Sequence, residues 1–188
     1  MRSRRAEMGE HVLLVGMMGS GKSTVGRIVA DRMRRPFRDS DADVERRTGK
    51  SVPAIFAARG EPAYRAEERA VLCAALTSLV PSVIAVAGGA VIDPETRRRL
   101  RSAGVVVWLD VAPHALVARV GAGAGRPLLA VDPAGTLERL DARRRPVYRE
   151  LSDVVLHVGA RRPEALAEDV VRAARAQFDG PTDGRSSW

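Results

Sequence analysis

The sequence has little cysteine, little lysine, few aromatic residues and no long apolar run. Cys73 is the single cysteine among 188 residues, so no disulfide can form within the chain. No apolar stretch approaches the roughly 18 residues that a membrane-spanning helix needs, and the charged segment 1–9 has no apolar segment behind it. These absences favour a cytoplasmic protein with no membrane partner.

The positive charge of the chain comes almost entirely from arginine. The formal net charge is +8, and Lys22 and Lys50 are the only lysines. Aromatic residues make up 4% of the chain, and the arginines are scattered over several predicted helices. A nucleic-acid surface would interleave stacking rings with its charge, so the composition argues against nucleic acid and leaves small anionic substrates as partners.

Apolar runs alternate with helical spacing along the chain, which predicts one α/β domain with a mostly parallel sheet covered on both faces. The run 105–109 is continuously apolar, as in a buried strand, so Trp108 is expected in the core. The domain is expected over 10–178, with disordered ends at 1–9 and 179–188. The expected strands lie at 11–16, 35–41, 82–89, 104–110 and 153–158. The expected helices lie at 22–34, 41–47, 52–59, 61–79, 94–102, 114–120, 133–151 and 163–178.

The stretch "GMMGSGKST" carries a phosphate-binding motif. Gly16, Gly21, Lys22 and Ser23 satisfy G-x-x-x-x-G-K-[ST] between a predicted strand and a predicted helix. Glycines let backbone N–H groups converge on phosphates, while lysine reaches the outer phosphates and the serine hydroxyl binds Mg²⁺. The predicted nucleotide-binding residues here are Gly19, Ser20, Gly21, Lys22, Ser23 and Thr24.

Two carboxylates follow at the expected end of the second strand. Asp39 and Asp41 are two residues apart and would share one face of a strand, so both could point toward the phosphates. One would hold water molecules of a metal ion and the other would accept a proton from a hydroxyl group. The structural alternative is that Asp39 or Ser40 only caps the next helix.

Taken in order, "GMMGSGKSTVGR", "DSDADVERRTG", "IFAARGEPAYRAEE", "AGGAV", "RPLLA" and "RRPVY" resemble the motifs of the shikimate kinase family. The resemblance covers about residues 11–178. It implies a three-layer α/β/α P-loop fold with a five-stranded parallel sheet in the order 2-3-1-4-5 and a mobile lid. It also implies transfer of the γ-phosphoryl group of ATP to the 3-hydroxyl group of shikimate, with Mg²⁺, in aromatic amino acid biosynthesis, by a monomer.

By this resemblance, Asp41 would bind substrate hydroxyls and assist deprotonation, and Asp39 would hold Mg²⁺ through water. Arg65 and Arg144 would clamp the substrate carboxylate, since a guanidinium group matches a carboxylate in a bidentate way. The motif leaves Arg143 and Arg145 as alternatives to Arg144.

The resemblance assigns further residues around the substrate. Apart from the resemblance, Glu68 lies three residues after Arg65 on the same predicted helical face, so it could hold that side chain in place. By the resemblance, Phe56 and Tyr64 would form aromatic walls. Gly88 and Gly89 would bring their backbone close to the substrate. Ala87 departs from the triple glycine of the family, and a positive φ at this position would make its methyl group costly.

The segment 120–130 resembles the lid of the family. Its glycines would permit closure, and Arg126 would stabilise the transferred phosphoryl group. Arg119 and Pro163 would enclose the adenine.

Three rival functions remain open at the level of sequence. One is a kinase for a related cyclitol, aminoshikimate or a sugar acid, favoured only by Ala87. The others are a nucleotide-binding module without catalysis, which the presence of Lys22, Ser23, Asp39, Asp41 and Arg126 opposes, and a basic nucleic-acid binder.

Overall fold

The computed structural model describes residues 10–120, 129 and 132–179. Within these residues, five parallel strands form one sheet in the order β2-β3-β1-β4-β5, which confirms the predicted order. The central strand β1 pairs with β3 on one side and with β4 on the other. The strands are β1 (His11–Val15), β2 (Phe37–Asp39), β3 (Val83–Ala85), β4 (Gly104–Asp110) and β5 (Val154–His157).

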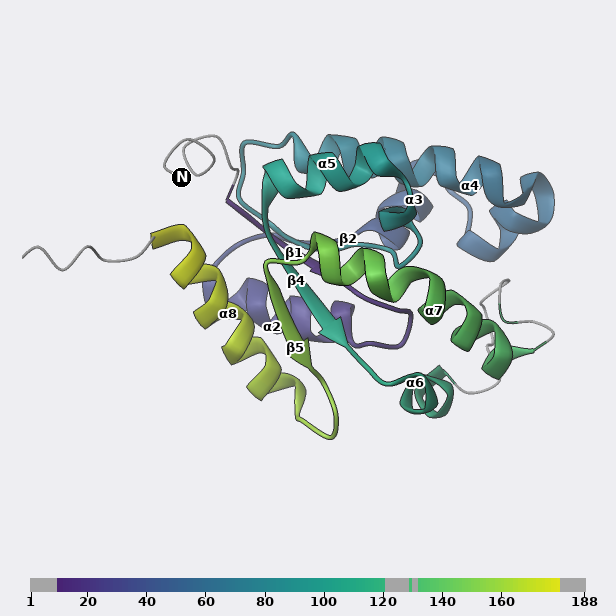
Figure 1. Ribbon diagram of the computed structural model, residues 1–188. Helices are drawn as coiled ribbons and strands as arrows, with labels where there is room; N and C mark the ends of the chain where they lie inside the picture. The colour runs from purple at the N-terminus through teal and green to yellow at the C-terminus, as the bar shows by residue number, and fades with distance from the viewer. Residues whose placement is uncertain (1–9, 121–128, 130–131, 180–188) are drawn as a thin grey trace, which may run out of the picture.

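Helices cover both faces of the sheet and complete the three layers (Figure 1). On one face α2 (Lys22–Met33) packs against α8 (Pro163–Asp179). On the other face lie α5 (Pro94–Ala103) and α7 (Pro133–Leu151), with α4 (Val52–Leu76) packed against α5. The smaller elements are α3 (Ser40–Thr48), which packs on α4, the 3₁₀ turn η1 (Ala90–Ile92), and α6 (Pro113–Val120), which packs on α7. None of the helices within the described ranges has the length and apolarity to cross a bilayer.

The interior of the sheet is apolar on both faces. Residues 105–109 of β4 are fully or almost fully buried, as expected of a strand covered by helices on each side. Trp108 is 3% exposed and stacks on Tyr148 of α7, with ring centroids 5.7 Å apart. The prediction that Trp108 belongs to the core is confirmed.

The predicted break between two helices at Gly60 is present, although both segments form one element, α4. Gly60 has φ 75° and ψ 175°, a conformation that only glycine adopts readily, and the helix changes direction there. The second segment ends at Leu76, three residues before the predicted end. Leu79 is 98% exposed, so it packs against no apolar surface and would not stabilise a longer helix.

Candidate active site

The predicted site residues gather where β1, β2 and β3 end. In parallel α/β sheets, ligands bind outside the carboxyl ends of the strands, where the strand order changes direction. Here the glycine-rich loop 16–21 follows β1, Asp39 ends β2, and 87–89 follow β3. A pocket at this edge is lined by Met18, Gly19, Lys22, Ser23, Asp39, Asp41 and residues 85–88.

The glycine-rich loop has the geometry of a phosphate cradle. Gly19 and Gly21 have φ 79° and 94°, which residues with side chains rarely adopt. Gly21 precedes α2, and no side chain caps this helix end, as is usual where a helix N-terminus binds a phosphate. The Lys22 ammonium group donates to the carbonyl oxygens of Gly16 and Met17, both at 2.9 Å. The Ser20 hydroxyl oxygen is buried with no partner among the described residues, and Thr24 is exposed on α2.

The acidic pair does not lie on one strand, and this part of the sequence prediction is wrong. Asp39 is the last residue of β2, but α3 begins at Ser40, so Asp41 lies in the first turn of that helix. Asp39 caps α3, because its carboxylate accepts from the Asp41 backbone N–H at 3.1 Å. The other oxygen of Asp39 accepts from the Ser23 hydroxyl at 2.5 Å. The capping role and the role at the phosphate-binding loop are therefore compatible, since each uses a different oxygen.

A tyrosine hydroxyl joins Asp41 to Glu68, a link that sequence reasoning missed. The Tyr64 hydroxyl lies in hydrogen-bond contact with Asp41 and, at 2.9 Å, with Glu68, while the ring packs on Phe56 at 5.0 Å between centroids. Asp41 keeps surface open to solvent, yet surrounding protein raises the pKa of its carboxyl, and the bond from Tyr64 opposes that rise. Burial likewise raises the pKa of Glu68, against the effect of Arg65. The one feature of the sequence that could have indicated this link is that the aromatic residue at position 64 is a tyrosine, which carries a hydroxyl group.

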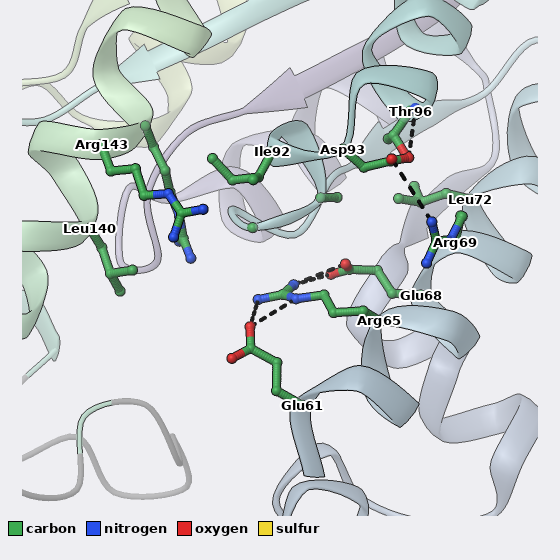
Figure 2. A pocket seen from close by; sticks show the side chains of 13 residues that line it. Glu61, Arg65, Glu68, Arg69, Leu72, Ile92, Asp93, Thr96, Leu140 and Arg143 are labelled. Carbon is green, nitrogen blue, oxygen red and sulfur yellow. Dashed lines mark hydrogen bonds and ion pairs between the residues drawn. The ribbon is translucent and has the colours of Figure 1, made fainter.

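Arg65 lies between two acids on α4 (Figure 2). Its Nη1 donates to both carboxylate oxygens of Glu68, at 3.0 and 2.9 Å, so Glu68 lies where it was predicted to orient this arginine. Its Nε and Nη2 donate to one oxygen of Glu61, at 3.1 and 2.8 Å. The guanidinium group lines a pocket of about 320 Å³ that reaches across to α7.

The three consecutive arginines of α7 have different environments. Arg144 is 4% exposed, and its Nε is buried without a partner among the described residues. Arg143 is exposed, whereas Arg145 forms ion pairs with Asp110 and Asp141, at 2.9 and 2.8 Å. Burial lowers the pKa of Arg144, and the charge of Arg65 adds to that effect. Arg143 and Arg144 both line the pocket that Arg65 lines, and Arg144 is the buried one of the two.

The segment 87–89 fits closely beneath these arginines. A methyl group on Gly88 would lie 3.0 Å from the Gly16 carbonyl oxygen, and one on Gly89 would lie 2.6 Å from the Arg65 Cζ. Ala87 has no positive φ, so its methyl group causes no backbone strain. Its N–H donates to the Ser40 hydroxyl at 2.8 Å, and the Tyr148 hydroxyl donates to the Gly88 carbonyl at 2.7 Å. The departure from three glycines is therefore accommodated, and Ser40 and Tyr148 are supports that the sequence analysis did not single out.

The residues predicted at the adenine lie at the end of α6 and the start of α8. Arg119, near the end of α6, donates to the carbonyl of Gly159 at 2.9 Å, and Pro163 opens α8 four residues after Gly159. Arg126 and almost all of the predicted lid lie outside the described residues. Only the backbone of Val120 and the buried Leu129 fall within the described part of this segment.

The parallel sheet in this order, with G-x-x-x-x-G-K-S between β1 and α2, defines the class of P-loop kinases. The family model for shikimate kinase matches residues 18–175. The chain belongs to the shikimate kinase family.

Individual relatives agree with this family. The chain is 43% identical over 162 residues to a shikimate kinase from Pseudomonas syringae pv. tomato, covering 86% of this chain and 94% of the relative. A shikimate kinase from Burkholderia thailandensis is 45% identical over 150 residues, covering 79% of this chain and 81% of the relative. Among solved structures, shikimate kinase from Acinetobacter baumannii in complex with shikimate has a TM-score of 0.84 at 34% identity. That match covers 90% of this chain and 95% of the other.

Proposed function

We propose that this protein transfers the γ-phosphoryl group of ATP to the 3-hydroxyl group of shikimate. The observation that carries the proposal is the buried Arg144, whose Nε has no partner among the described residues, in one pocket with Arg65. A carboxylate between two guanidinium groups would satisfy both by charge-assisted hydrogen bonds. That pocket adjoins Gly88 and Gly89, next to the phosphate-binding loop, so a bound acid would present its hydroxyl groups toward the phosphates.

The nucleotide would bind along the loop between β1 and α2. Lys22 would exchange its bonds to the Gly16 and Met17 carbonyls for bonds to the outer phosphates, which bind lysine more strongly because they are charged. The donors suit Mg²⁺, since the Ser23 hydroxyl and the Asp39 carboxylate meet at 2.5 Å and Mg²⁺ prefers oxygen ligands completed by phosphates and water. When bound, Mg²⁺ would neutralise charge on the phosphate oxygens.

Asp41 is the group proposed to accept the proton of the substrate hydroxyl. It lines the same pocket as Lys22, Ser23 and Gly88, and the Tyr64 hydroxyl holds its carboxylate from the other side. Neighbouring protein raises the pKa of Asp41, which makes its carboxylate a better proton acceptor than an ordinary aspartate. Three further roles rest on the family resemblance. Arg126 would stabilise the charge of the transferred group, and Arg119 and Pro163 would contact the adenine.

The test is ADP release measured with ATP and Mg²⁺ in the presence of shikimate, quinate, gluconate or buffer alone. We expect release with shikimate to exceed the other three by at least about a hundredfold, because a positioned substrate hydroxyl replaces water as acceptor. Preference for quinate or gluconate would favour a related kinase. Nucleotide binding with no release in any arm would favour a binding module. The monomeric state and the cytoplasmic location remain predictions from the sequence.

A further inference from the structure

Each nitrogen of the Arg65 guanidinium group donates to an acid on its own helix. All three of its nitrogens donate to carboxylates: Nη1 to Glu68, and Nε and Nη2 to a single oxygen of Glu61. Figure 2 shows the guanidinium plane lying between these two acids. A substrate carboxylate that binds the Nε and Nη2 edge of Arg65 in a bidentate way must therefore take the place of Glu61.

The two acids differ in how firmly they are held. The side chain of Glu68 is 3% exposed and also contacts the Tyr64 hydroxyl. Breaking its contact with Arg65 would therefore leave a buried carboxylate without its positively charged partner. The side chain of Glu61 is 47% exposed, so water can replace Arg65 as its partner. Glu61 is therefore the acid that a substrate can displace.

The backbone around Glu61 explains why it reaches Arg65. Gly60 interrupts α4 with a positive φ, so Glu61 begins the second helical segment, and Arg65 follows one turn later. Residues four apart on a helix are neighbours, and an acid that precedes a base gives the favourable order. The contact is thus a local consequence of the helix and requires no substrate.

The charge of Glu61 also acts on the second arginine of the pocket. Arg144 is buried, and Arg65 lowers its pKa further, whereas the negative charge of Glu61 acts in the opposite direction. The charge of Glu61 therefore acts on both guanidinium groups of the pocket, as the charge of a carboxylated ligand would.

We infer that Glu61 takes the place of the substrate carboxylate at Arg65 until substrate binds, and that substrate binding displaces it from the Nε and Nη2 edge of Arg65. The inference rests on the proposed function, because it takes the ligand to be a carboxylic acid such as shikimate. Glu61 would lower affinity for the acid while keeping Arg65 extended and ready in its absence.

The sign of the effect separates this role from a structural one. If Glu61 competes with the ligand, Glu61→Gln tightens binding of shikimate, since an amide binds a guanidinium group less well than a carboxylate does. A partly exposed pair of this kind predicts a gain of about two- to fivefold, or about 0.4–1 kcal/mol at 1.4 kcal/mol per decade. If Glu61 only positions Arg65, the same change weakens binding.

The experiment is isothermal titration of the full-length protein with shikimate in the absence of ATP. Wild type, Glu61→Gln and Glu67→Gln are compared, with thermal denaturation to verify folding. Glu67 is the matched control because it carries the same charge on α4 but pairs with Arg47 at 3.1 Å and with Arg59 at 3.9 Å. We expect Glu61→Gln to bind two- to fivefold more tightly and Glu67→Gln to bind as wild type does.

The inference is overturned if Glu61→Gln binds shikimate equally or more weakly, or if Glu67→Gln gains as much, because the effect would then be one of net charge. The methyl ester of shikimate, which has no carboxylate, is titrated in parallel. We expect wild type and Glu61→Gln to bind the ester with equal affinity. If Glu61→Gln gains as much affinity for the ester as for the acid, the inference is also overturned. Failure of wild type to bind shikimate at all would instead refute the proposed function.

Discussion

Replacing Gly89 with alanine should abolish tight shikimate binding while the protein stays folded. The added methyl group would lie 2.6 Å from the Cζ and Nη1 of Arg65, where carbon atoms pack best at about 3.5–4.0 Å. The contact is with the end of a flexible side chain, so Arg65 would withdraw by about 1 Å and the backbone would keep its place. Gly89 has φ −88° and ψ −18°, which alanine adopts without strain.

The size of the effect follows from the bonds that Arg65 would lose. A hydrogen bond to a charged group contributes about 1.5–3 kcal/mol, which corresponds to about 10–150-fold in affinity. We expect Gly89→Ala to weaken shikimate binding by this factor and to leave ATP binding within about twofold, because the nucleotide loop is on the other side of Gly88. The melting temperature should change little, since a compatible alanine restricts the unfolded chain and so stabilises by about 0.4–1 kcal/mol, which offsets part of the displaced contact.

A double-mutant cycle tests whether the effect passes through Arg65. Isothermal titration with shikimate would compare Gly89→Ala, Arg65→Ala and the double variant. If the methyl group acts by displacing Arg65, Gly89→Ala should cost less than about twofold once Arg65 is already absent. Full additivity of the two losses, or shikimate affinity of Gly89→Ala within threefold of wild type, would refute the reasoning.

Other predictions concern groups farther along the site and in the core. Lys22→Ala should abolish turnover in a folded protein, because the positive charge serves phosphates; near-normal steady-state rates would remove the P-loop assignment. Tyr64→Phe should lower the maximal rate at least about tenfold with the KM for ATP unchanged, since it removes only the hydroxyl that holds Asp41; unchanged rates would contradict this role. His11 is buried and accepts from the Ser82 N–H at Nδ1, and burial lowers its pKa below the unfolded value of about 6.5. The contribution of neutral His11 to the free energy of unfolding is therefore fully present above about pH 6.5 and decreases as the pH falls below it. Urea denaturation at pH 7.5 and 5.5 should therefore show a larger loss for wild type than for His11→Asn, and equal losses would exclude this histidine as the cause.

The sequence predicts most of the fold because its signals are local. The continuous apolarity of β4, the glycine-rich loop between β1 and α2, and the break at Gly60 each depend on neighbouring residues, and each is present in the structure. The prediction was wrong where a short strand ends and the next helix begins. β2 has only three residues, and the capping carboxylate of Asp39 starts α3 at Ser40, so alternation along a strand wrongly placed Asp41.

The order of the three arginines on α7 shows what a sequence cannot supply. Arg143, Arg144 and Arg145 have the same side chain, and successive helix positions point about 100° apart, so the rotation of the whole helix decides which one is buried. That rotation is fixed by distant partners: Tyr148 packs on Trp108 and donates to Gly88, and Arg145 binds Asp110 at the end of β4. With these contacts made, Arg143 and Arg144 both line the pocket beside Arg65, and Arg144 is the buried one. The proposed carboxylate site therefore depends on the packing of α7 against β4 and the glycine segment, which explains why motif order alone left the choice among three residues open.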